Sequence, residues 1–153
     1  CTLLTLVRTA PVAASEKFIF TEEVLREVNI GYASPEFRRI YLGKEVKSAS
    51  AGELNLSRLE HKSLDSHILA QLGDKAKINL AHFLKFIKAQ SHGQIGVFPT
   101  GWQGNIAYIP DADGTVWAVN ANWDSGNRCW GVYAYSVADR GGWRAGSQVL
   151  SCK

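Results

Sequence analysis

The sequence predicts an α+β fold in which N-terminal and middle helices pack on one face of a C-terminal four- to five-stranded antiparallel β-meander. Two observations carry this prediction. Apolar residues recur with helical spacing in the middle of the chain, and after Gly93 they alternate with polar residues as in β-strands. The 153 residues, 46% hydrophobic and 20% charged, have the size and composition of one globular domain over residues 1–153.

Two short strands are predicted at the start of the chain. Residues 3–7 are apolar and predict a strand that ends at Pro11, because proline has no N–H for a strand ladder. Residues 16–20 (EKFIF) predict a second short strand.

The segment from residue 21 to residue 32 admits two structures. Thr21 followed by two glutamates is typical of a helix start, where a hydroxyl caps the helix and acidic side chains suit its dipole. Alternatively, the segment stays extended. Its apolar residues alternate as in a strand: Val28, Ile30 and Tyr32.

The middle of the chain predicts three helices, each with its own start signal. Ser34 before a proline starts the first, Ser63 or Asp65 starts the second, and a capping Asn79 starts the third. The third helix has the clearest apolar stripe: Leu80, Phe83, Leu84 and Ile87. Residues 44–56 are polar and rich in small residues, so they predict a loop.

The last third of the chain predicts strands joined by turns. The alternating stretches are residues 95–98, 105–109, 115–123, 129–137 and 147–150. Aspartate, asparagine and glycine predict turns between them, at residues 111–114, 124–127 and 139–142. Residues 111–114 also match the first positions of a calcium loop, but the later ligands of that motif are missing. We therefore interpret them as a turn.

The strand at residues 115–123 has two contrasting faces. One face is predicted to be core: Trp117, Val119, Ala121 and Trp123. The other face carries Asn120 and Asn122, and asparagine is disfavoured in strands. Two asparagines at alternate positions therefore indicate a polar, open sheet surface whose amides suit a sugar or a peptide, or simply face solvent.

Aromatic residues outside this core predict a binding surface. All five tryptophans lie in the last third of the chain, and Trp102 stands on a glycine-flanked loop where burial is difficult. Tyr133 and Tyr135 lie opposite the apolar side chains of their own strand. Exposed aromatic rings suit macromolecular partners. The candidate binding residues are Trp102, Asn120, Asn122, Tyr133 and Tyr135.

From this surface we predict a non-enzymatic binding or regulatory protein that contacts a protein or another macromolecule. A hydrolase with a Cys/His-based site is one alternative, although Cys129 is predicted at a strand start rather than at a helix N-terminus that would activate its thiol. No phosphate-binding loop is present, and no two histidines have the i, i+4 spacing of a zinc helix. We therefore predict no cofactor and no metal site.

A weak nucleic-acid binder is the other alternative. Its basic residues lie mostly in the N-terminal half: Arg38, Arg39, Lys44, Lys47, Lys75, Lys77, Lys85 and Lys88. The formal net charge is only +3, whereas dedicated nucleic-acid binders have a stronger basic stripe. We expect these residues to be a solvated surface rather than a nucleic-acid site.

The three cysteines leave several interpretations open. Cys129 and Cys152 are candidates for a disulfide if the last strand folds back on the strand that begins near Cys129. Cys1 is either a lipidated first residue or the residue after a removed initiator methionine. No stretch has the roughly 20 apolar residues of a membrane span. We predict a cytoplasmic protein, with a secreted or periplasmic one, lipid-anchored at Cys1, as the alternative.

Several segments together resemble a known family. They are residues 41–45 (YLGKE), 63–65 (SLD), 69–73 (LAQLG), 79–83 (NLAHF), 105–109 (NIAYI) and 132–137 (VYAYSV), followed by Trp143, Gly146 and residues 148–151 (QVLS). The set resembles an uncharacterised family of short proteins from reduced-genome candidate-phylum bacteria. The resemblance implies a bacterial, intracellular protein in which Cys1 follows a removed methionine, and it implies no activity, cofactor or partner.

Overall fold

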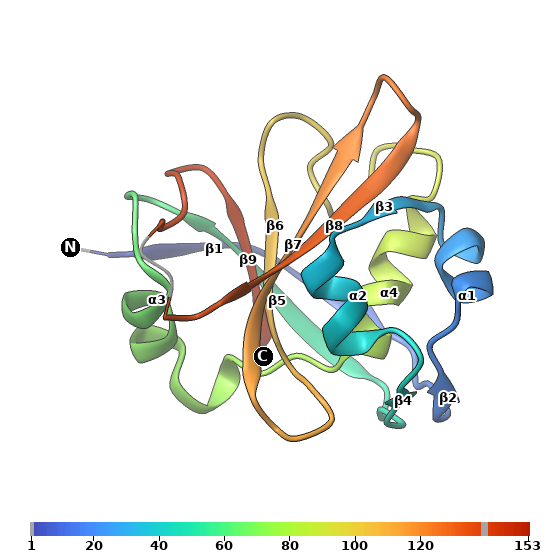
Figure 1. Cartoon of the computed structure of the whole chain (residues 1–153). Helices are drawn as coiled ribbons and strands as arrows, with labels where there is room; N and C mark the ends of the chain where they lie inside the picture. Colours follow the sequence, from blue (N-terminus) through green and yellow to red (C-terminus); the bar gives the residue numbers. More distant parts are fainter. Residues whose placement is uncertain (1, 139–140) are drawn as a thin grey trace.

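Seven strands from both halves of the chain form one mixed β-sheet in the computed structural model (Figure 1). The structure describes residues 2–138 and 141–153, so the expectations for Cys1 and for Asp139 and Arg140 of a predicted turn lie outside the described residues. The strand order is β1-β5-β9-β6-β7-β8-β3. The bounds are β1 Leu4–Val12, β3 Ile30–Ala33, β5 Gly52–Leu59, β6 Asn105–Pro110, β7 Val116–Asp124, β8 Cys129–Ser136 and β9 Gln148–Cys152.

The other elements are short. A separate pair of strands consists of β2 Phe18–Ile19 and β4 Glu45–Val46. The helices of the described residues are α1 Glu22–Glu27, α2 Pro35–Tyr41, α3 Asp65–Leu72 and α4 Leu80–Ala89, with a 3-10 turn at Gly73–Lys75.

The predicted α+β class is confirmed, but the predicted antiparallel C-terminal meander is wrong. β6, β7 and β8 do pair antiparallel in sequence order. However, β9 pairs parallel to β6 and antiparallel to β5, and β3 joins the sheet parallel to β8. Alternation in a sequence predicts that a strand exists, but it does not say which strand is its partner. The N-terminal strands therefore complete a sheet that the sequence patterns assigned to the C-terminal part alone.

Three local predictions also need correction. β1 continues through Pro11 to Val12, because an edge strand leaves half of its N–H groups unpaired and so tolerates a proline. Residues 44–56 contain β4 and the first part of β5, whose Leu54 and Leu56 reach the core. Residues 95–98 form a loop instead of a strand.

The predicted capping residues start three of the four helices. Thr21 Oγ1 accepts a hydrogen bond from the Val24 N–H at 3.4 Å, and Ser34 Oγ accepts one from the Phe37 N–H at 3.2 Å. Asn79 Oδ1 accepts one from the Ala81 N–H at 2.7 Å. Each bond satisfies an N–H that has no partner within its own helix. The segment at residues 21–32 combines both predicted structures, since α1 is followed by the strand β3.

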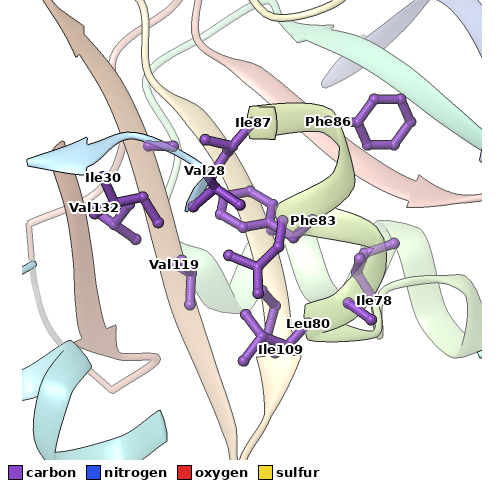
Figure 2. Close-up of a cluster of buried hydrophobic side chains, with 14 of the residues drawn as sticks. Val28, Ile30, Ile78, Leu80, Phe83, Phe86, Ile87, Ile109, Val119 and Val132 are labelled. Atoms are coloured by element: carbon purple, nitrogen blue, oxygen red, sulfur yellow. The ribbon is translucent and has the colours of Figure 1, made fainter. Parts of the chain in front are cut away.

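The main core lies between the sheet and the helices α1, α2 and α4. Figure 2 shows Leu80, Phe83 and Ile87 of α4 directed toward the sheet, beside Ile109 and Val119. The predicted stripe of α4 is confirmed, because all four of its side chains are at most 6% exposed. Burial of each such side chain contributes about 1.5–3 kcal/mol to stability.

The prediction that the Trp face of β7 belongs to the core is confirmed. Val119 and Ala121 are fully buried, and Trp117 and Trp123 are half-buried against the main core. The Trp123 ring meets the buried Trp130 edge to face, with 5.5 Å between the ring centroids. This part of the core therefore fixes the orientation of β7, so Asn120 and Asn122 must point to the opposite side of the sheet.

The opposite face of the sheet is covered only in part. A smaller core cluster there contains Ile68 of α3, together with Leu59, Ile106, Tyr108, Ala118 and Val149. Helices thus pack on both faces, whereas the sequence predicted one covered face. The β3 edge of the sheet lies away from α3, as Figure 1 shows.

Candidate functional site

The part of the sheet beyond α3 gathers polar and aromatic side chains from three adjacent strands. Asn120 of β7 pairs with Tyr133 of β8, and Asn122 pairs with Gly131. The parallel pairing of β3 with β8 places Tyr32 opposite the same Gly131. Directly paired residues project on the same side of a sheet. We call this surface the tyrosine–asparagine face: Tyr32, Asn120, Asn122, Tyr133 and Tyr135.

A pair of tyrosine rings forms the centre of this face. Tyr32 is 50% exposed, and its ring centroid lies 5.5 Å from that of the half-buried Tyr133. The Tyr133 ring leans over Gly131, because a Cβ atom at Gly131 would lie 3.2 Å from the Tyr133 hydroxyl oxygen and 3.3 Å from Cε1. Gly131 thus leaves room for a ring that lies along the strand. The two rings, tilted by 44° to each other, are both accessible to solvent.

An amide chain runs beside the two rings. Asn120 is only 9% exposed; its Oδ1 accepts a hydrogen bond from the Asn105 N–H at 3.0 Å, and its Nδ2 donates to Asn122 Oδ1 at 2.7 Å. Asn122 is half-buried, and its Nδ2 has no partner within residues 2–138 and 141–153. Asn120 therefore positions Asn122, which presents an amide donor at the surface.

A second polar network holds Asn105, the residue whose N–H binds Asn120. The Asn105 Nδ2 donates to the carbonyl oxygens of Pro99 and Ala121, at 3.3 Å and 3.1 Å. The Gln148 Nε2 donates to Asn105 Oδ1 at 2.9 Å. These bonds join three strands of the sheet through buried side chains, and such networks hold their members in one geometry.

Two loops border the tyrosine–asparagine face. Trp102 is 55% exposed, as its glycine-flanked loop predicts, and the Arg144 guanidinium lies 4.6 Å from its ring centroid. Two residues after Trp102, Gly104 packs so closely on Asn120 that a Cβ there would lie 2.4 Å from Oδ1. Trp102 therefore stands beside the face rather than within it.

At the other border, Tyr135 is 40% exposed and meets the ring of Trp143 edge to face, 5.6 Å between centroids. The buried Asp65 holds Trp143 in place: Asp65 Oδ1 accepts hydrogen bonds from Trp143 Nε1 at 2.6 Å and from the Tyr108 hydroxyl at 2.7 Å. Burial, followed by the negative charge of Asp65, raises the pKa of Tyr108 far above its ordinary value, so Tyr108 remains a hydrogen-bond donor. We interpret this aspartate as an anchor for the border.

The turn at residues 111–114 is confirmed as a turn. The Asp111 N–H donates to the Thr115 carbonyl oxygen, and the Asp111 carboxylate accepts hydrogen bonds from the Asp113 and Thr115 N–H groups and from Trp117 Nε1. Burial alone raises the pKa of Asp111, but these hydrogen bonds outweigh it and hold the pKa below its ordinary value.

The geometric condition for a disulfide between Cys129 and Cys152 is not met. Both thiols are free, and the two residues lie on β8 and β9 with β6 and β7 between them. Burial raises the pKa of the Cys152 thiol, which makes it a poorer nucleophile. Among the described residues, no three His, Cys, Asp or Glu side chains are placed to hold a metal ion.

The basic residues considered for a nucleic-acid site divide between separate places. Lys44, Lys47 and Lys77 line a pocket of about 290 Å³ near the turn at residues 111–114. Lys85 and Lys88 of α4 lie at a second hollow, with Arg8 of β1. Arg38 and Arg39 form ion pairs with Glu22 and Glu36.

Of the five predicted binding residues, the structure places Asn120, Asn122 and Tyr133 next to one another on β7 and β8. Tyr135 and Trp102 lie at the borders of this group. The sequence patterns do not assign Tyr32, Gly131 and Trp143 to the site. Alternation at Ile30 and Tyr32 indicated a strand, but the parallel pairing of β3 with β8, which joins residues about a hundred positions apart, has no local signal.

Comparisons with protein-family models, with curated proteins and with solved structures found no match. No helix in the part of the chain that the structure describes is both long enough and apolar enough to cross a lipid bilayer. The geometry of the tyrosine–asparagine face is therefore the basis for assigning a function.

Proposed function

We propose that this protein is a non-enzymatic binding protein that holds a neutral carbohydrate chain on the tyrosine–asparagine face. The observation that carries the proposal is the Tyr32–Tyr133 ring pair beside the unpaired amide donor of Asn122. The C–H faces of a sugar ring pack on aromatic rings, and its hydroxyl groups exchange hydrogen bonds with amides. A pair of aromatic rings flanked by an amide offers both interactions side by side.

The charge of the face favours a neutral ligand. Its five members are all uncharged, and Arg144, at the border, lies against Trp102. Proteins that bind single-stranded nucleic acids combine stacking rings with a positively charged groove along the phosphates. The five members of the tyrosine–asparagine face offer rings and amides but no positive charge, so they suit a polyhydroxylated ligand better than a polyanion.

The width of the face favours a chain over a single small molecule. Its members come from the three adjacent strands β3, β8 and β7. Since neighbouring strands lie about 4.8 Å apart, the face is about 10 Å wide. The rings and amides are spread over this width as a surface, which is the arrangement expected for contacts with successive units of a polymer.

The first experiment screens the purified protein against an array of neutral oligosaccharides and against insoluble cellulose and chitin. The best soluble binder is then titrated calorimetrically. Tyr133→Ala is expected to weaken binding at least tenfold, because truncation of a central aromatic contact costs more than about 1.4 kcal/mol. Gly131→Ala, which must displace the Tyr133 ring, is expected to weaken binding less.

Ile95→Ala is the matched control, because Ile95 is a fully exposed apolar side chain on the loop after α4. This variant should bind like the unmodified protein. Two results would contradict the proposal: no measurable binding to any neutral glycan, or binding that survives in a Tyr32→Ala/Tyr133→Ala double variant with an unchanged fold.

A further inference from the structure

A groove between β1 and α4 lies away from the tyrosine–asparagine face. It has a volume of about 660 Å³, within the range of pockets that hold small ligands or several side chains. Its apolar wall consists of Ala10, Val12, Phe86, Ala89 and Val97. Its charged members are Arg8, Lys85 and Lys88. We call it the β1–α4 groove.

The charge of this groove is uncompensated. Arg8, Lys85 and Lys88 take part in none of the ion pairs found among residues 2–138 and 141–153. No aspartate or glutamate lines the groove. Three cations beside apolar surface, with no acidic neighbour in the wall, give a local positive potential that attracts a negatively charged partner.

The groove runs along the free edge of the sheet. β1 ends the strand order and pairs only with β5 among the described strands. At the start of the same strand, Leu6 and Val7 are both more than half exposed. An extended peptide binds such an edge through its main chain and places alternate side chains in neighbouring pockets.

Two features of β1 restrict what binds there. The register shifts between Leu6 and Arg8, and Pro11 has no N–H to offer. Both features are known to discourage indiscriminate strand pairing at sheet edges. A partner therefore depends on the charged and apolar side chains of the groove as well as on main-chain hydrogen bonds.

We propose that the β1–α4 groove binds an extended peptide segment of a partner protein in which acidic side chains flank apolar ones. The apolar side chains of the segment would pack on Ala89 and Val97, the accessible apolar members of the wall, and its carboxylates would pair with the three cations. The groove has no exposed aromatic ring for stacking bases, because Phe86 is 5% exposed. This favours an acidic peptide over a nucleic acid.

The test uses the full chain and three fluorescein-labelled eight-residue peptides in fluorescence anisotropy. One peptide alternates Glu with Leu and Val, the second has Gln in place of each Glu, and the third has Lys. The unmodified protein is expected to bind the Glu peptide at least tenfold more tightly than the Gln peptide, and not to bind the Lys peptide.

Charge reversal locates the site. Lys85→Glu/Lys88→Glu is expected to weaken binding of the Glu peptide at least tenfold and to create binding of the Lys peptide. Lys44→Glu/Lys47→Glu changes the net charge equally but lies outside the groove, and should leave Glu-peptide binding within twofold. Because Lys85 is half-buried, Arg8→Glu/Lys88→Glu, with both side chains exposed, repeats the test if the first variant fails to fold.

Three results overturn the proposal: no binding of the Glu peptide, equal losses in the two groups of variants, or binding of a single-stranded oligonucleotide that depends on Lys85 and Lys88 while no peptide binds. Glycan binding is expected to be unchanged in all these variants, since the tyrosine–asparagine face contains none of the substituted residues. If the groove proves to bind no peptide, the proposed carbohydrate function is therefore unaffected.

Discussion

Gly93→Ala tests how closely the loop after α4 packs on the core. Gly93 has a backbone φ of 70°, and a Cβ atom there would lie 2.3 Å from Cε2 of Trp123. The Trp123 ring cannot move freely, because it packs edge to face on the buried Trp130. The substitution therefore imposes both a backbone penalty and a steric one.

A matched glycine separates the two penalties. Gly43 has a φ of 81°, but nothing lies within 4 Å of its Cβ position. A left-handed backbone costs alanine about 1–2 kcal/mol, partly offset by the reduced freedom of the unfolded chain, about 0.4–1 kcal/mol. Gly43→Ala should thus destabilise the protein by about 1 kcal/mol or less. Overpacking adds about 1–3 kcal/mol, so Gly93→Ala should destabilise the protein by about 1–4 kcal/mol.

Urea denaturation followed by tryptophan fluorescence and by circular dichroism measures both free energies of unfolding. Equal m-values for the two variants establish that the comparison concerns the native state. Equal destabilisation by the two substitutions would refute the packing of Trp123 on Gly93. A Gly93→Ala protein as stable as the unmodified one would refute the backbone argument as well.

Two further predictions concern polar groups. Asn120→Ala leaves the N–H of Asn105 without its buried acceptor, so the free energy of unfolding should fall by about 1–3 kcal/mol in urea titrations; Asn122→Ala, at a half-buried position, should lose less than Asn120→Ala. The lowered pKa of Asp111 gives stability that is fully present above the unfolded pKa of about 3.9 and is lost as the pH falls through the folded value. Asp111→Asn should therefore flatten the dependence of stability on pH below about 4, and an unchanged acid dependence would contradict the hydrogen-bond argument.

The features that the sequence predicts well are those that depend on neighbouring residues. Thr21, Ser34 and Asn79 cap helices because the side-chain oxygen meets an N–H two or three residues later. The stripe of α4 follows from helical geometry alone. The turn at residues 111–114 likewise forms from its own aspartate and the backbone beside it.

The features that the sequence did not predict depend on pairings between distant segments. The polar residues of β5 suggested a loop, yet this strand lies between β1 and β9 and buries Leu54 and Leu56. Tyr32 meets Tyr133 only because β3 pairs parallel to β8. In the candidate site, alternation placed Asn120 and Asn122 on the correct side of β7. It did not show that Asn120 accepts a hydrogen bond from the Asn105 N–H and donates one to Asn122 Oδ1, which leaves the Asn122 Nδ2 without a partner among the described residues.

The two proposed sites occupy opposite ends of the strand order and depend on different physical terms. The β1–α4 groove attracts its partner through three cations that form no ion pair with a described residue, and a salt concentration of 0.1 M already reduces the Debye length to about 10 Å. The tyrosine–asparagine face has no charged member, and contacts of rings and amides respond little to salt. Peptide binding should therefore weaken as salt is raised while glycan binding stays constant. If peptide binding and glycan binding declined together, one charged surface would account for both ligands, and the assignment of two separate sites would be wrong.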